Sequence, residues 1–146
     1  RVAMEGTIKR LNVKAMPPPG FPTGLQPQIG VLLSLADGAS ILTESVWENR
    51  FRYVNELRRM GAQVQVDGKV AVFQGVDHLE GAPVKAVDLR AGAAVVIAAL
   101  AAHGHTEIED IHHIERGYDS IVEKLRALGA DIRRITVPDT SVAQAL

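Results

Sequence analysis

An internal repeat constrains the fold of this chain more than any other feature of its sequence. Arg50 and Arg116 are 66 positions apart, and the segment 57–62 (LRRMGA) matches the segment 125–130 (LRALGA) 68 positions later. Around these landmarks each unit has the pattern of a helix, a strand, a turn with an arginine, a second helix, Gly-Ala and a strand. The repeat therefore predicts an α/β unit that the chain uses twice.

The first unit is predicted over about 16–75, after a strand at 9–15. Its expected elements are a proline-rich loop at 16–22, a helix at 24–36 capped by Thr23, a strand at 40–45, a helix at 52–60 and hairpin strands at 63–66 and 69–73. Asp67-Gly68 is expected to form the hairpin turn, because both residue types tolerate positive φ. Gly38 and Gly61 are expected at the left-handed positions that follow the two helices.

The second unit is predicted over about 82–137 and is followed by a tail at 138–146. Its expected elements are a strand at 84–87, a helix at 89–102, a strand at 106–109, a helix at 118–128 and a strand at 131–137. Gly104 and Gly129 are expected to follow the two helices, as Gly38 and Gly61 do in the first unit.

Composition narrows the class of protein. The 146 residues are 47% hydrophobic and 23% charged, which is typical of one folded domain. A net charge of −1 and only six aromatic residues give no support to a nucleic-acid or anionic-membrane partner. The longest apolar run, 91–102, is too short to span a bilayer, and no signal peptide opens the chain. With no cysteine, the chain has no disulfide, cysteine metal site or cysteine nucleophile.

Three arginines are the best candidates for binding a ligand. Arg50, Arg90 and Arg116 are each predicted where a strand leads into a helix. A helix N-terminus favours anions, and a guanidinium group matches a carboxylate or phosphate with two parallel hydrogen bonds. These arginines predict a small ligand with two or three negative charges. The alternative is an ordinary salt bridge from each arginine to its acidic neighbour, namely Glu48, Asp88 and Glu115.

The histidines give little indication of a metal site. The pairs His103/His105 and His112/His113 lack a further ligand at the spacing of a helical turn. The glycine-rich phosphate-binding motifs and the nucleophile motif of the α/β hydrolases are absent from the sequence.

Four segments together resemble one enzyme family. They are 19–26 (PGFPTGLQ), 43–51 (TESVWENRF), 88–92 (DLRAG) and 113–118 (HIERGY). Their order and spacing, from residue 1 to about 135, resemble the C-terminal part of the UDP-N-acetylglucosamine enolpyruvyl transferases, also called 1-carboxyvinyltransferases. The ENRF and HIERGY segments favour this cell-wall family over its relatives in the shikimate pathway.

This resemblance implies a fold and an activity. The fold would be an inside-out α/β barrel with helices inside and sheets outside, and residues 1–146 would form two of the three repeats of one domain. The reaction would transfer enolpyruvyl from phosphoenolpyruvate to the 3-hydroxyl of UDP-N-acetylglucosamine in peptidoglycan precursor synthesis. The implied location is the cytoplasm, the implied processes are cell wall biogenesis, cell shape and the cell cycle, and no cofactor or metal is expected.

The resemblance also implies roles for individual residues. Arg116 matches an arginine that binds phosphoenolpyruvate, and Arg50 and Arg90 match arginines that hold its anionic groups. Asp88 matches an aspartate in the active-site cleft. Two further positions, Thr23 and Val46, match residues that line the sugar-nucleotide site.

One position departs from the family pattern. The family has an aspartate after Phe-Pro-Thr that takes the proton from the sugar hydroxyl, and this chain has Gly24 there. Glycine can neither act as a base nor accept that hydrogen bond. Gly24 is therefore either a disabling change or the mark of a diverged or inactive relative, and Asp88 is a candidate for a partial substitute.

Three hypotheses about the chain follow. In the first, it is part of a transferase and is inactive by itself, because the active site lies between two domains and the family's reactive cysteine lies in the other one. In the second, it binds phosphoenolpyruvate or phosphate weakly through the three arginines without catalysis. In the third, an unpaired sheet edge and an uncovered helix face make it self-associate.

Overall fold

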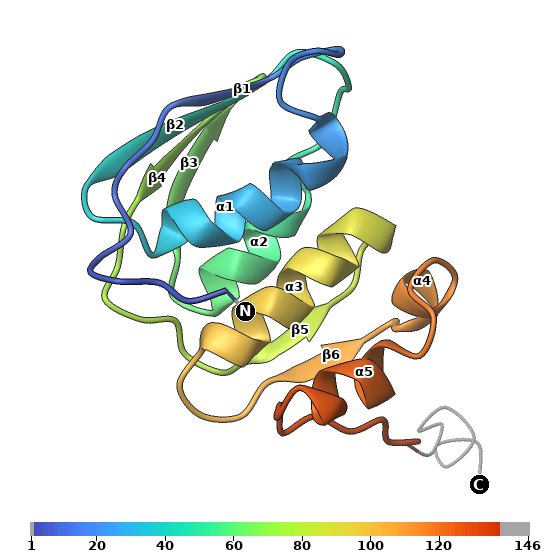
Figure 1. Ribbon diagram of the computed structural model, residues 1–146. Coiled ribbons are helices and arrows are strands. Elements are labelled where there is room, and N and C mark those ends of the chain that lie inside the picture. The colour runs from blue at the N-terminus through green and yellow to red at the C-terminus, as the bar shows by residue number, and fades with distance from the viewer. Residues whose placement is uncertain (1, 138–146) are drawn as a thin grey trace, which may run out of the picture.

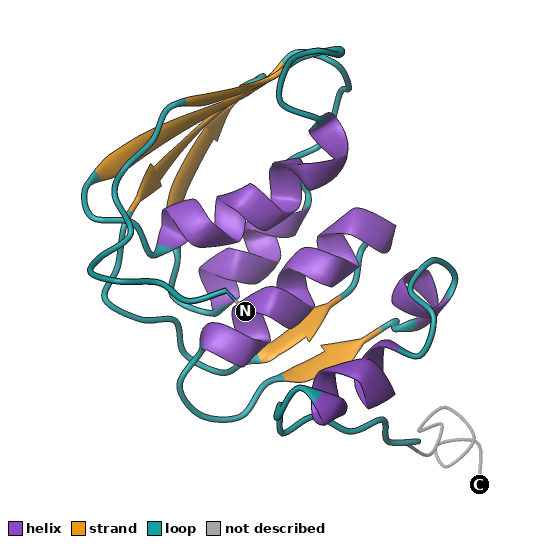
Figure 2. Cartoon of the chain, in the orientation of Figure 1, coloured by secondary structure: helices purple, strands orange, loops and turns teal. Residues whose placement is uncertain are grey.

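Three helices lie between two β-sheets in this protein (Figures 1 and 2). The computed structural model describes residues 2–137. The elements, in chain order, are β1 (Val13–Ala15), the 3₁₀ helix η1 (Thr23–Leu25), α1 (Gln26–Ser34), β2 (Ala39–Glu44), α2 (Tyr53–Arg59), β3 (Gln63–Asp67), β4 (Val70–Gln74), β5 (Pro83–Lys85), α3 (Leu89–Ala101), β6 (Glu107–Glu109), α4 (His112–Glu115) and α5 (Ile121–Ala127).

Each of the two sheets contains one parallel pair of strands that is joined through a helix. In the larger sheet, with strand order β1-β2-β4-β3, β1 runs parallel to β2, and β4 is antiparallel to both of its neighbours. In the smaller sheet β5 runs parallel to β6. Both parallel pairs are joined through a helix, as β1–α1–β2 and β5–α3–β6, because parallel strands require a crossover. The predicted α/β class is confirmed.

Helix α3 shows why helices can occupy the interior of this fold. Its sequence is almost entirely small and aliphatic, and most of its residues are buried, including Ala91, Ala94, Val95 and Ala98, while one side keeps exposed aliphatic side chains. A helix that is apolar on every side is stable only when other elements surround it. Here α3 packs against α1, α2 and β5, and its small side chains allow the neighbouring helices to come close.

Helix α2 connects the two sheets. It packs against β3 of the larger sheet and β5 of the smaller one. The buried carboxylate of Glu56 accepts a hydrogen bond from the backbone N–H of Lys85 in β5 at 2.9 Å and pairs with Arg59 at 3.3 Å. Through the hydrogen bond to Lys85, Glu56 fixes the position of β5 relative to α2, while Arg59 on the same helix binds the same carboxylate oxygen.

The centre of the core is Tyr53, the first residue of α2. Its side chain is fully buried, and its hydroxyl donates a hydrogen bond to Oε1 of buried Gln26 at 2.6 Å. Gly30 in α1 faces the same ring, because a Cβ at position 30 would lie 2.6 Å from the Tyr53 hydroxyl oxygen. Tyr53 therefore holds α1 against α2 through a polar contact and a close approach.

Most predicted element positions agree with the structure, including the four glycines after helices. Gly38, Gly61, Gly104 and Gly129 have φ of +98°, +94°, +84° and +102°. Glycine reaches this left-handed region without the steric cost that a Cβ imposes.

Two predictions in the first unit are wrong. Thr23 does not cap α1, because it lies inside η1 and its hydroxyl donates to Glu44 instead, while α1 begins at Gln26 with a proline in its first turn. The hairpin turn is Gly68-Lys69 and not Asp67-Gly68, because Asp67 pairs with Val70 and Gly68 alone takes positive φ. A two-residue turn needs glycine at its first position in this arrangement.

The second unit differs from prediction in three places. A short helix, α4, was missed before Arg116, and the helix expected at 118–128 begins at Ile121. The strand expected at 131–137 is absent. Its counterpart in the first unit, β3, pairs only with β4, and the counterpart of β4 would fall beyond Val137, outside the described residues. Among the described residues, no strand pairs with this segment. The predicted tail at 138–146 also lies outside those residues.

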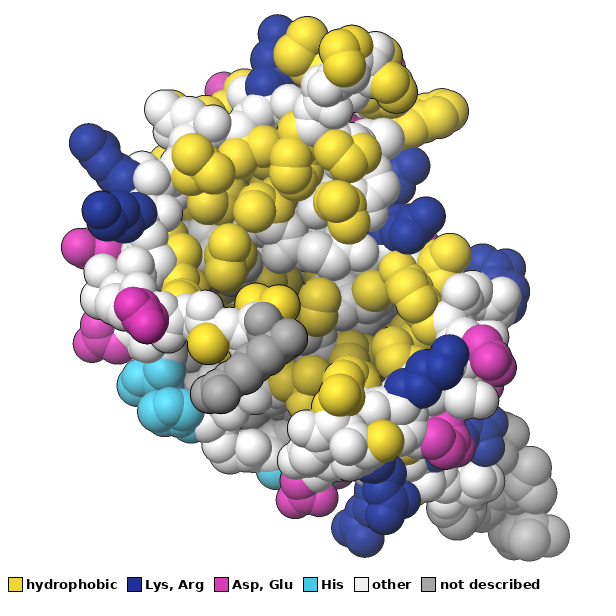
Figure 3. Space-filling model, in the orientation of Figure 1, with side chains coloured by type: hydrophobic (Ala, Val, Ile, Leu, Met, Phe, Trp, Pro, Cys, Tyr) yellow, Lys and Arg dark blue, Asp and Glu magenta, His cyan; other side chains and the backbone are white. Residues whose placement is uncertain are grey.

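Hydrophobic side chains remain exposed on one face of the helix layer. Figure 3 shows them gathered over α1 and α3, where Leu32, Ile97 and Leu100 are all more than 40% exposed. No helix within residues 2–137 is long and apolar enough to cross a membrane.

We predict that Gly30→Ala lowers the free energy of unfolding. The new methyl group would overlap the Tyr53 ring. Overpacking of a core in this way lowers the free energy of unfolding by about 1–3 kcal/mol. Chemical denaturation measures the change. Gly24→Ala is the control, because its Cβ would meet only Arg90 at 3.8 Å. Equal stability of the two variants would contradict the close contact.

We also predict that Tyr53 makes the protein sensitive to alkali. Burial raises the pKa of the Tyr53 phenol, and the Glu44 carboxylate raises it further. Above pH of about 10 the unfolded chain loses this proton while the folded one keeps it, so stability falls as pH rises.

The Tyr53→Phe variant should reduce this slope by up to about 1.4 kcal/mol per pH unit. Denaturation curves at pH 9 to 11 measure the effect, with Tyr118→Phe as the control for the other tyrosine. The same slope in the wild type and in Tyr53→Phe would contradict the assignment.

Candidate functional site

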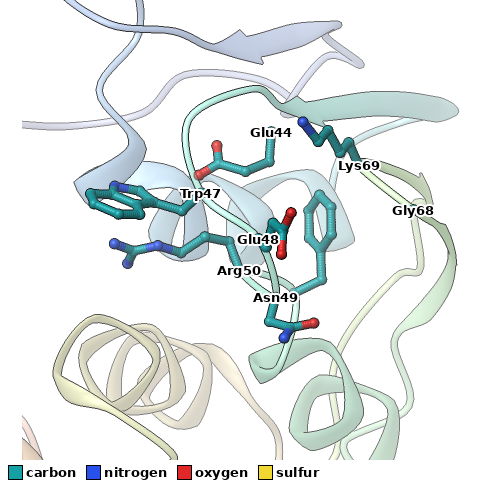
Figure 4. A pocket seen from close by; sticks show the side chains of 8 residues that line it. Glu44, Trp47, Glu48, Asn49, Arg50, Gly68 and Lys69 are labelled. Atoms are coloured by element: carbon teal, nitrogen blue, oxygen red, sulfur yellow. The ribbon is translucent and has the colours of Figure 1, made fainter.

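A cavity of about 240 Å³ lies beside the loop that joins β2 to α2 (Figure 4). Its lining combines charged, aromatic and polar groups: Glu44, Trp47, Glu48, Asn49, Arg50, Phe51, Gly68 and Lys69. The loop supplies most of them, while Glu44 ends β2 and Gly68-Lys69 is the hairpin turn. The site is therefore formed where one end of the larger sheet meets the start of α2.

Arg50 is held in this loop by an aromatic contact. Its guanidinium carbon lies 5.8 Å from the centroid of the Trp47 ring, within the range of a cation–π interaction, and Figure 4 shows the two side chains next to one another. The preceding residue, Asn49, has φ of +55°, which bends the loop at this point. Val46, half-buried, lies at the start of the same loop.

Gly24 and Arg90 face each other across the two predicted units. A Cβ at position 24 would lie 3.8 Å from both Cζ and Nε of Arg90. Arg90 is the second residue of α3, and its Nη1 donates to the hydroxyl of Tyr118 at 3.4 Å. A side chain at position 24 would thus contact a guanidinium group directly.

Asp88 has a structural task at this point. It is the N-cap of α3, and its Oδ1 accepts a hydrogen bond from the backbone N–H of Ala91 at 2.8 Å. The cap satisfies one of the free N–H groups at the start of the helix. It also fixes the position of Arg90, two residues further along.

The three arginines do not pair with their acidic neighbours. Among residues 2–137, no ion pair joins Arg50 to Glu48, Arg90 to Asp88 or Arg116 to Glu115. Glu115 instead pairs with Arg134 at 2.7 Å. The salt-bridge interpretation is therefore wrong for these three pairs.

Arg116 differs from the other two arginines in its setting. It is exposed and is the C-cap of α4, so the expectation that it lies near a helix N-terminus is wrong. The missed helix α4 is the reason. Since the C-terminal end of a helix carries partial negative charge, α4 does not favour an anion beside Arg116.

Glu44 is a candidate site residue that the sequence analysis missed. Its side chain is 1% exposed, Oε1 accepts a hydrogen bond from the hydroxyl of Thr23, and Oε2 has no partner among the described residues. The structure places Glu44 on the inner face of β2 with Ser40 and Leu42. The sequence 40–44 (SILTE) gives no clear alternation of polar and apolar residues, because Ile41 lies on the outer face.

The described residues contain no group of three or more histidine, aspartate or glutamate side chains that could hold a metal ion. The ring centroids of His78 and His103 lie 4.3 Å apart with the rings stacked, and the ring centroids of His112 and His113 lie 4.1 Å apart.

Comparison with known proteins places this geometry in a family. The profile of the family EPSP synthase (3-phosphoshikimate 1-carboxyvinyltransferase) matches residues 1–125. The chain is 58% identical to UDP-N-acetylglucosamine 1-carboxyvinyltransferase 3 of Caldanaerobacter subterraneus subsp. tengcongensis over 92% of its own length and 32% of the relative's. It is 60% identical to UDP-N-acetylglucosamine 1-carboxyvinyltransferase 1 of Clostridium perfringens, over 88% of its own length and 30% of the relative's.

Solved structures agree with this assignment. The enolpyruvyl transferase NikO from Streptomyces tendae aligns with a TM-score of 0.81 and 39% identity, over 89% of this chain and 30% of NikO. An EPSP synthase from Acinetobacter baumannii shares the fold, with a TM-score of 0.58 and 23% identity over 87% of this chain and 29% of that one. The chain thus spans about a third of the length of its relatives. It belongs to the EPSP synthase family of carboxyvinyl transferases.

Proposed function

We propose that this chain forms part of a UDP-N-acetylglucosamine 1-carboxyvinyltransferase. The reaction transfers enolpyruvyl from phosphoenolpyruvate to the 3-hydroxyl of UDP-N-acetylglucosamine and releases phosphate. The observation that carries the proposal is the identity of 58% and 60% with two relatives of that name, over about nine-tenths of the chain. The three arginines support it, because none of them pairs with an acidic side chain within residues 2–137, and phosphoenolpyruvate carries both a carboxylate and a phosphate.

The roles of the arginines follow from their surroundings. Arg90 lies where α3 begins, and Arg50 lies over Trp47 beside the cavity, so both are held in place before a ligand arrives. Arg116 is exposed and supplies a further guanidinium group to phosphoenolpyruvate. Thr23 and Val46 would line the sugar-nucleotide side, and Asp88 would hold the start of α3 in position.

The chain would supply two of the three repeats of one domain, at about 16–75 and 82–137. Catalysis would then need the other domain of the protein, so this chain alone is expected to be inactive. The exposed hydrophobic face over α1 and α3 would pack against the third repeat. The product would enter peptidoglycan synthesis in the cytoplasm, and through it cell wall biogenesis, cell shape and the cell cycle.

We expect Gly24 to control the rate of this reaction. A full-length protein made by exchanging this chain for the matching third of the Caldanaerobacter relative allows the test. In it, Gly24→Asp should raise the rate of phosphate release from phosphoenolpyruvate and UDP-N-acetylglucosamine by about 10²-fold or more, the scale of a positioned general base.

Gly24→Asn is the matched control, since asparagine has the shape of aspartate without its basicity. No phosphate release from either the Gly24 or the Gly24→Asp protein would contradict the proposed function. An equal gain from Gly24→Asn would show that a base is not what the position lacks.

We expect Arg116→Ala to weaken anion binding in the same full-length protein. Loss of one charge-assisted hydrogen bond should cost about 1.5–3 kcal/mol of binding free energy for phosphoenolpyruvate. Calorimetry measures the affinity, and Arg126→Ala is the control because Arg126 is an exposed arginine on α5. The same affinity in Arg116→Ala and wild type would mean that Arg116 does not contact the ligand.

A further inference from the structure

Glu44 has an arrangement that packing does not explain. A carboxylate that is 1% exposed, with one oxygen lacking any partner among the described residues, is costly to keep in a protein interior. The nearby Tyr53 hydroxyl does not help, because it donates to Gln26. Such an unsatisfied buried group calls for an explanation other than stability.

The position of Glu44 relative to the site supplies an explanation for its oxygen that is unpaired within residues 2–137. Its Oε1 accepts a hydrogen bond from the hydroxyl of Thr23, which immediately precedes Gly24. Since the Thr23 proton points to Glu44, the lone pairs of its oxygen are free to accept a hydrogen bond from a substrate hydroxyl. Glu44 also lines the cavity that contains Arg50.

Transfer to a hydroxyl requires a group that accepts its proton, and Gly24 offers none. We propose that Thr23 and Glu44 together accept the proton of the acceptor hydroxyl: Thr23 contacts the hydroxyl, and Glu44 is a positioning residue that acts through Thr23. This inference rests on the proposed function and identifies the proton acceptor in this chain.

The step conserves atoms and charge. The acceptor O–H bond breaks as its proton passes to Oγ of Thr23, while Thr23 passes its own proton to Oε1 of Glu44. The freed electron pair forms the new bond to the central carbon of phosphoenolpyruvate, whose methylene carbon takes a proton from water. On elimination that proton returns to water, and the phosphate leaves with the proton from Glu44.

Three other charged side chains line the cavity beside Glu44. Lys69, whose backbone carbonyl accepts from the N–H of Glu44 at 2.8 Å, and Arg50 both line the same cavity. Glu48 is the acidic group on the cavity wall, and Tyr53 on α2 is a neutral phenol whose pKa the Glu44 charge helps to raise. Two cationic side chains and one further anionic side chain therefore line the cavity together with Glu44.

The test uses the full-length exchange protein and compares two backgrounds, Gly24 and Gly24→Asp. In the Gly24 background, Glu44→Gln should lower kcat by about 10²-fold or more and remove the fall in activity toward acid. In the Gly24→Asp background the same change should cost less than about 5-fold, because a second base is present. Thr23→Ser should keep the activity, and Thr23→Val should lose it.

Glu56→Gln is the matched control, because Glu56 is a buried glutamate that contacts Lys85 and Arg59, away from the site. Melting temperatures of all variants separate loss of turnover from loss of folding.

Four outcomes would overturn the inference. An active Gly24 protein that Glu44→Gln leaves unchanged, or equal losses in both backgrounds, would leave Glu44 with a purely structural task. Activity only in the Gly24→Asp background would show that the pair cannot replace an aspartate, while the proposed function stands. Inactivity in both backgrounds would overturn the proposed function together with this inference.

Discussion

The contact of Tyr53 with Gln26 and Gly30 is the constraint on which the site depends. It fixes α1 against α2 at their first turns, by a buried hydrogen bond at one end of the tyrosine and by a missing Cβ beside its ring. Gln26 comes directly after η1, which carries Thr23 and Gly24, and Tyr53 comes directly after the loop that carries Arg50. One buried pair of residues thus fixes the position of η1, with Thr23 and Gly24, relative to the loop that carries Arg50.

The sequence predicts what local chemistry decides in this fold. The repeat and the glycines at 38, 61, 104 and 129 mark the units and the helix ends, because a left-handed residue after a helix depends on its own backbone alone. Prediction from the sequence fails where a contact with a residue far along the chain decides the local structure. Thr23 has the chemistry of a helix cap, but its hydroxyl donates to a carboxylate 21 positions away. The segment 131–137 has the composition of a strand but forms none.

The candidate site divides in the same way. The arginines can be found from the sequence, because their residue type and their place beside helices are local facts. Whether Glu48, Asp88 and Glu115 would neutralise them could not be told from proximity in the chain: Glu115 pairs with Arg134, 19 positions on, and Asp88 caps its own helix. Glu44 was missed although the alternation of β2 places it inward, because a buried charge without a partner is not what a strand pattern leads one to expect.

Placing helices inside the fold explains why Gly24 and Arg90 lie close together although they belong to different predicted units. Gly24 belongs to the segment that starts α1, and Arg90 to the start of α3, and these two helices pack against each other. The small residues of α3 permit that close packing. Gly92 has the same effect on the side of α4, since a Cβ there would lie 2.5 Å from the Ile114 side chain. The separation of Gly24 and Arg90 is therefore set by helix packing, so a change of side-chain volume in α3 would reach the site without touching it.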